Sequence, residues 1–73
     1  MRESIKLLDV VALTEDLPDR ALLRGQVGTI VELLSPDVFE VEFADADGQT
    51  YAMLSLRRNQ LMLLHYEPMR IAG

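Results

Sequence analysis

The chain has 73 residues, is 49% hydrophobic, and carries 7 basic and 12 acidic side chains, which give a net charge of −5. This length allows one domain, and the hydrophobic fraction excludes a disordered chain. The absence of cysteine excludes disulfides and thiolate metal sites, and the acidic balance opposes binding to nucleic-acid phosphates and favours a basic partner.

The first predicted strand covers residues 6–13, "KLLDVVAL", where hydrophobic side chains fall on both faces. A strand of this kind is central in its sheet or covered on both sides. A polar loop over residues 14–24 follows, and Pro18 prevents a regular strand from continuing through it. The middle of the loop, "PDRALLRG", has the length for one helical turn but not for a stable helix.

The second predicted strand covers residues 26–34 and does not alternate like a flat strand. Val27, Ile30 and Val31 cannot all point to one side unless the strand bulges or coils. A glycine inside a strand often marks such a bulge. We therefore expect Gly28 to bend the strand so that these three side chains reach the core.

The third predicted strand, "VFEVEF" at residues 38–43, has the cleanest alternation in the chain. Phe39 and Phe43 would face the core, while Glu40 and Glu42 would face solvent. This pattern is typical of a half-buried strand at the surface of a small sheet.

Two glycines are expected at turns. "DADG" follows the third strand and predicts a tight hairpin, with Gly48 available for a positive φ. Gly25, which begins the turn "GQVG", is expected to allow the chain to leave the long loop sharply.

The fourth predicted strand, residues 49–54, pairs back onto the third. Residues 56–60, "LRRNQ", predict a single 3₁₀ turn, and residues 61–66 the fifth strand. The domain is then expected to span residues 1–66, with residues 67–73 as a C-terminal tail. This order of strands and loops favours an all-β, five-stranded SH3-like barrel, and a five-stranded OB-type barrel is the alternative.

The predicted strands and turns contain Asp9, Leu17, Pro18, Gly25, Gly28 to Glu32, Glu40 to Phe43, and Gly48. With these residues the chain resembles a small bacterial family known as domain of unknown function 4926. The likeness covers roughly residues 6–64, and Ala21-Leu22 departs from the Gly-Leu pair that the family often has. It implies an SH3-like barrel but no activity, and some members look like partners of toxin systems. A looser similarity links the chain to KOW-type segments of ribosomal and transcription factors.

No motif in the sequence carries catalytic chemistry. "GQVG" lacks the lysine and the following helix of a phosphate loop. "DADG" is similar to the start of a calcium loop, but the twelfth position is Leu56 instead of glutamate. His65 is the single histidine, and no serine lies in a nucleophile elbow. We therefore expect no enzyme activity, no metal and no cofactor.

Two surfaces are candidates for a protein partner. The acidic side of the hairpin would attract a basic partner. A small barrel cannot enclose all of its Leu, Val, Ile and Met side chains, so an apolar C-terminal face is expected to meet another chain. The candidate residues are Glu40, Glu42, Asp45, Asp47, Met53 and Met62.

The sequence thus predicts a non-enzymatic SH3-like interaction module, which self-associates or serves as an accessory or antitoxin-like partner of a larger protein. The alternative is a KOW-like module that binds RNA or DNA through Arg20, Arg24, Arg57 and Arg58. No apolar run approaches the roughly 20 residues of a membrane span, and no signal-peptide cleavage site follows the N-terminus. A cytoplasmic location is expected.

Overall fold

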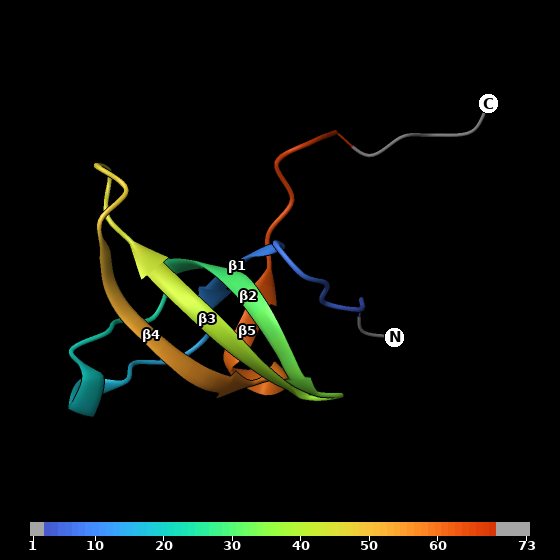
Figure 1. The fold of residues 1–73 in the computed structure, drawn as a ribbon, viewed down its shortest axis with the longest axis horizontal. Helices are drawn as coiled ribbons and strands as arrows, with labels where there is room; N and C mark the ends of the chain where they lie inside the picture. The colour runs from blue at the N-terminus through green and yellow to red at the C-terminus, as the bar shows by residue number, and fades with distance from the viewer. Residues whose placement is uncertain (1–2, 69–73) are drawn as a thin grey trace.

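The computed structural model of the chain describes residues 3–68. Five antiparallel strands form one sheet in the order β4-β3-β2-β1-β5 (Figure 1). Two 3₁₀ turns interrupt the strands, and residues 3–68 contain no α-helix. The predicted SH3-like, all-β fold is confirmed, although the sheet is not fully closed and β4 and β5 are its edges. The elements are β1 (Val10–Leu13), η1 (Pro18–Arg20), β2 (Val27–Ser35), β3 (Val38–Ala44), β4 (Thr50–Arg57), η2 (Arg58–Gln60) and β5 (Leu61–Leu63).

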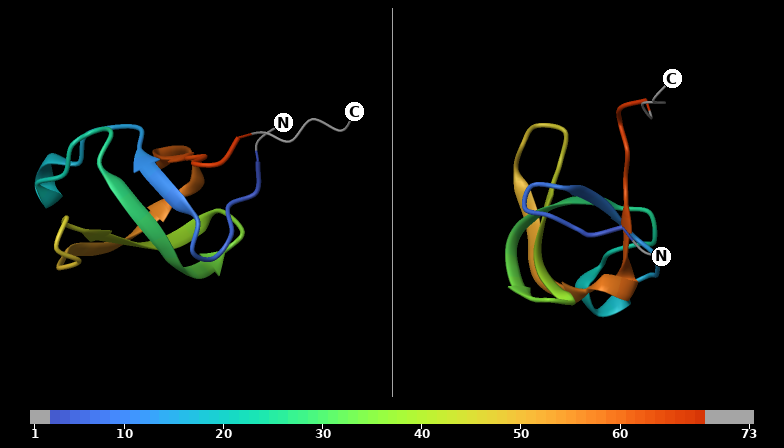
Figure 2. Two further views of the ribbon diagram at one scale, coloured as in Figure 1. Left: turned by 90° about the horizontal axis from the view of Figure 1, so that it is seen from above. Right: turned by 90° about the vertical axis from the view of Figure 1, so that its right-hand side faces the viewer.

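The sheet curls around the long axis of the molecule, so that one of its faces encloses the core (Figure 2). Alternate residues of β3 enter this core, as the sequence predicts: Phe39, Val41 and Phe43 are buried, while Glu40 and Glu42 lie on the other face. A strand that pairs along both edges, like β1, is central, and Val11 and Leu13 are fully enclosed. The core cluster comprises Ile5, Val11, Leu13, Leu22, Ile30, Phe39, Val41, Phe43, Leu54, Leu56 and Leu61.

The strand β2 bends at two register shifts in its pairing with β3, one between Ile30 and Glu32 and one between Leu33 and Ser35. At each register shift β2 has one extra residue, which strengthens the local twist. The twist allows β2 to pair with β1 on one edge and with β3 on the other. The bulges therefore lie several residues beyond the position that the sequence predicts.

Gly28 has a different role from the expected bulge. It is buried and lies in regular pairing, opposite Val11 of β1. A Cβ atom at Gly28 would lie 2.7 Å from Val41 Cγ1 and 3.0 Å from both Phe43 Cε2 and the carbonyl oxygen of Glu42. The missing side chain thus lets β3 residues pack against the backbone of β2.

The prediction that Val27, Ile30 and Val31 all reach the core holds for Ile30 alone, because Val31 does not pack against the core cluster. Ile30 is fully buried, Val31 is half-buried, and Val27 is 48% exposed. Because Gly28 itself faces inward, the residue before it must face outward, and Val27 lies on the solvent side of the sheet.

The turns contain glycine where the sequence places it. Gly25 and Gly48 adopt φ values of 91° and 81°, a region in which other residues are strained. The hairpin between β3 and β4 is fixed by Asp45, whose Oδ1 accepts hydrogen bonds of 2.9 Å from the backbone N–H groups of Asp47 and Gln49. The predicted hairpin is confirmed.

Some element boundaries differ from the prediction. β1 begins at Val10 because the preceding residues form a turn, in which the backbone N–H of Lys6 donates to Asp9 Oδ2 at 2.8 Å. β4 continues to Arg57, three residues beyond the predicted end, and β5 stops at Leu63. Of the predicted tail, residues 69–73 lie outside the described residues.

Two segments cover the openings that the incomplete sheet leaves. The loop between β1 and β2 inserts Leu22, which is 1% exposed, and Leu22 bridges to Leu17 across η1. The N-terminal segment inserts Ile5, which is 8% exposed. Arg58 holds this segment in place: its Nη2 donates to the carbonyl of Glu3 at 3.1 Å.

Candidate docking face

Ala12 identifies an apolar surface outside the core. Val11 and Leu13 enter the barrel, so alternation directs Ala12 to the outer side of β1. Ala12 is nevertheless only 4% exposed, and it is absent from the core cluster. Its cross-strand partners are Val27 on β2 and Met62 on β5, which flank it on the two sides. These two side chains are themselves 48% and 54% exposed.

A second row of side chains extends this surface. Val10 lies opposite Thr29 of β2, and the N–H of Leu64 donates to the carbonyl of Val10 at 3.0 Å. Val10 and Leu64 are half-buried, yet neither packs against the core cluster. The outer side of β5, β1 and β2 is thus a continuous apolar face. We call it the outer apolar face; it comprises Val10, Ala12, Val27, Met62 and Leu64.

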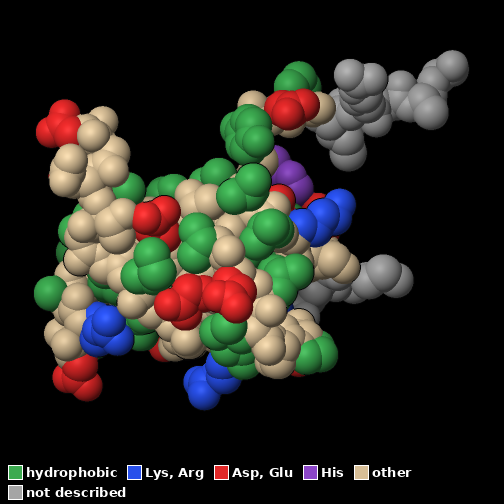
Figure 3. Space-filling view, viewed as in Figure 1, with side chains coloured by type: hydrophobic (Ala, Val, Ile, Leu, Met, Phe, Trp, Pro, Cys, Tyr) green, Lys and Arg blue, Asp and Glu red, His purple; other side chains and the backbone are tan. Residues whose placement is uncertain are grey.

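Three carboxylates lie on the outer side of β2 and β3, and one of them, Glu42, is separated from Val10 by Thr29 in a single cross-strand row. Glu42 on β3 is opposite Thr29, and Glu40 is opposite Glu32 of β2. Figure 3 shows acidic side chains gathered in the middle of the molecule's front, over β2 and β3, with hydrophobic side chains around them. Glu32, Glu40 and Glu42 are called the acidic patch.

The acidic patch has hydrogen-bond partners but no counter-charge. Ser55 Oγ donates to Glu40 at 2.9 Å, and Thr50 Oγ1 donates to Glu42. Among residues 3–68, the ion pair is that of His65 with Glu3, and no Lys or Arg pairs with the patch. Three negative charges therefore face solvent without compensation from the described part of the chain.

The pair of carboxylates at Glu32 and Glu40 gives a testable prediction. Like charges directly opposite in a sheet repel, whereas opposite charges contribute about 0.2–1 kcal/mol. Glu32→Lys is therefore expected to raise Tm by a few degrees in circular-dichroism melts at low salt, and less at high salt. Asp47→Lys at the exposed hairpin tip makes the same charge change as a control. An equal rise for both variants would assign the gain to net charge and contradict this pairing.

The structure separates the predicted partner-binding residues into two groups. Glu40, Glu42 and Met62 belong to the acidic patch and the outer apolar face, and Met53 is 46% exposed on β4 opposite Glu42. The two aspartates lie on the hairpin instead, which projects from the barrel in Figure 1. The Asp45 carboxylate is engaged in the turn.

Ala12, Val27 and Glu32 complete these surfaces and were missed by the sequence reasoning. Val27 was assigned to the core, and the position of Glu32 beside Glu40 depends on the bulge in β2. The available signal was the apolar character of both faces of the first predicted strand, which indicates an apolar outer face at Ala12.

The four arginines of the nucleic-acid alternative do not form one surface. Arg20 lies on η1 and Arg58 begins η2, and these turns lie apart along the long axis in Figures 1 and 2. The Arg58 guanidinium is engaged by the carbonyls of Leu61 and Glu3, at 2.9 and 3.1 Å. Arg24 is exposed in the loop before β2, and Arg57 is exposed at the end of β4.

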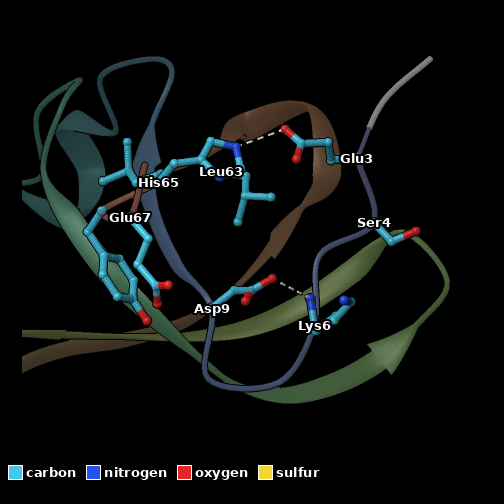
Figure 4. A pocket seen from close by; sticks show the side chains of 9 residues that line it. Glu3, Ser4, Lys6, Asp9, Leu63, His65 and Glu67 are labelled. Carbon is cyan, nitrogen blue, oxygen red and sulfur yellow. Dashed lines mark hydrogen bonds and ion pairs between the residues drawn. The ribbon is translucent and has the colours of Figure 1, made fainter. Parts of the chain in front are cut away.

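A hollow of about 540 Å³ lies between the N-terminal segment and the residues after β5 (Figure 4). His65 Nε2 meets Glu3 Oε1 at 2.9 Å on one side, and Asp9 bonds to the Lys6 backbone on the other. No hydrogen bond joins His65 to Ser4 within residues 3–68, and this part of the chain contains no group of residues arranged to hold a metal ion. The side chains that line the hollow carry both signs of charge, with Lys6 among Glu3, Asp9 and Glu67.

Comparison with known proteins gives a family. Residues 7–63, which include all five strands, match the family described as "Domain of unknown function (DUF4926)". No curated protein and no solved structure matches the chain. Within residues 3–68, no helix has the length and apolar character that a membrane crossing requires.

Proposed function

The chain belongs to the DUF4926 family of domains of unknown function. We propose that it is a non-catalytic module that binds another protein through its outer apolar face. The observation that carries this proposal is the burial of Ala12 on the outer side of β1, between two cross-strand partners that are half exposed. A barrel this small cannot enclose all of its apolar side chains, so those that gather on its outer side are available to a partner.

Hydrophobic burial supplies the driving force for docking on this face. Full burial of a Val or Met side chain contributes about 1.5–3 kcal/mol relative to exposure. Val27 and Met62 are roughly half exposed, so a partner that covers both gains about 1 kcal/mol from each. Half-buried Val10 and Leu64 extend the contact along the strands.

The charge of the molecule favours a different protein over a second copy. A two-fold interface through the outer apolar face would bring the acidic patch of one copy close to that of the other. The net charge of −5 adds to this repulsion. Nucleic acid is disfavoured because the Arg58 guanidinium is engaged within the domain.

The proposal is tested by photo-crosslinking in the native cell. p-Benzoylphenylalanine replaces Met62 in one variant and Asp47, at the hairpin tip, in the control. We expect one protein to be captured at position 62 and not at position 47. The purified partner should then bind the wild-type domain, and Met62→Ser should weaken that binding at least tenfold, since a polar side chain cannot replace the apolar contact.

Three results would contradict the proposal. One is equal capture at the two positions. Another is a dimer, detected by light scattering, that Met62→Ser dissociates, because this would assign the face to self-association. The third is a salt-sensitive complex with oligonucleotides that Arg57→Glu abolishes, which would favour the nucleic-acid alternative.

A further inference from the structure

We infer that the partner protein docks on the outer apolar face with a segment that is basic and amphipathic. This segment has apolar side chains along one edge and Lys or Arg along the other. This inference rests on the proposed function and adds the chemistry of the partner. It follows from the position of the acidic patch relative to the outer apolar face.

The two surfaces are joined by a single cross-strand row. Val10 of β1 pairs with Thr29 of β2, and Thr29 pairs with Glu42 of β3. Neighbouring strands are about 4.8 Å apart, so the step from the apolar to the acidic side is roughly 10 Å. An α-helix with its side chains has about this diameter. One segment can therefore place an apolar stripe over β1 and the flexible ends of its basic side chains over β3.

The electrostatics select the sign of that second edge. Glu32 and Glu40 face each other across β2 and β3, and no described Lys or Arg pairs with them. A basic side chain between them would relieve their repulsion, whereas an acidic one would increase it. The same argument excludes an acidic peptide, an anionic lipid surface and a second copy of this patch as the occupant.

Each surface contributes a different property of the complex. Exposed ion pairs are weak and screened by salt, so the acidic patch contributes selectivity and association rate more than affinity. The outer apolar face contributes the salt-independent part of the affinity. These two contributions can be separated by experiment.

The probes are two fluorescently labelled model helices with leucine at the same positions. All remaining positions are lysine in one peptide and glutamate in the other. We expect the Leu/Lys peptide to bind in fluorescence anisotropy, at least tenfold more tightly than the Leu/Glu peptide. Glu40→Gln with Glu42→Gln should weaken the Leu/Lys complex by about tenfold and flatten its salt dependence. Asp47→Asn, a charge change on the hairpin, should leave binding unchanged. Met62→Ser should weaken binding at every salt concentration.

Thermal melts of each variant exclude loss of folding as the cause, since glutamine retains an acceptor for Ser55 and Thr50. Equal affinity for the two peptides would overturn the inference, and so would a loss on Asp47→Asn as large as the loss on the patch variants. If position 62 still captures a protein in the cell, such a result rejects the basic partner alone. If position 62 captures nothing and Met62→Ser leaves peptide binding unchanged, the proposed function itself fails.

Discussion

Gly28→Val is expected to lower the free energy of unfolding by about 3 kcal/mol or more, and Gly28→Ala by about 1–3 kcal/mol. The first added carbon would lie 2.7 Å from Val41 Cγ1, a side chain that is itself fully buried. It would also lie 3.0 Å from the carbonyl oxygen of Glu42, which β3 holds in place. A core this small supplies only about 3–5 kcal/mol in total, so the valine variant should be largely unfolded.

Urea denaturation followed by circular dichroism measures this effect, and Gly25 offers a matched control. Gly25 needs its positive φ of 91°, but no atom lies within 4 Å of where its Cβ would be. Asparagine tolerates this backbone conformation, so Gly25→Asn should cost little, whereas Gly28→Asn should cost as much as Gly28→Val. Wild-type stability for Gly28→Ala would mean that β3 can move away from β2 without loss of packing, which would contradict the close approach described above.

Phe43→Ala is expected to cost about 3–5 kcal/mol, the largest loss from any single truncation in this core. Phe43 is fully buried and the largest of the fully buried side chains. Its ring also contacts Tyr51, with centroids 6.3 Å apart, so alanine would remove an aromatic pair and leave a cavity beside Gly28.

Phe43→Leu provides the comparison, because it retains most of the apolar volume and should cost far less. Thermal melts and one-dimensional NMR spectra of the two variants distinguish partial from complete loss of packing. Phe43→Ala should also abolish docking, because Glu42, the residue before Phe43, lies on the outer side of the same strand. Phe43→Leu should retain docking. A well-folded Phe43→Ala variant would show that the core depends on the other strands instead.

The succession of strands along the chain, the hairpin, the helical turn in the first loop and the 3₁₀ turn before β5 could be predicted because each rests on local signals. The alternation in "VFEVEF" and the glycine of "DADG" need no knowledge of distant residues. The position of the β2 bulges could not be predicted, because they are fixed by pairing with β3. A shift of one residue moves a side chain to the opposite face, which is why Val27 was assigned to the core.

The residues of the candidate docking face could be predicted only where local alternation defines the two sides of a strand. Glu40 and Glu42 lie on the outer face of β3, as the alternation of that strand predicts, and Met62, proposed for partner binding, is exposed on β5. Glu32 depends on the bulged strand, and Ala12 is small enough that its character alone indicates neither face. The turn before β1 was not predicted either, because Leu8 has a φ of 71°, a conformation that a leucine in the sequence does not indicate.

The contact between Glu3 and His65 joins positions that are 62 residues apart in the chain. The segments at Glu3 and His65 therefore meet at one seam in the surface of the barrel, and the chain after β5 runs away from the barrel beyond it (Figure 1). A short peptide bridge across this seam would turn the fold into a ring with little loop-closure entropy. In such a ring, the tip of the hairpin at residues 45–48 would serve equally well as the place where the polypeptide begins and ends.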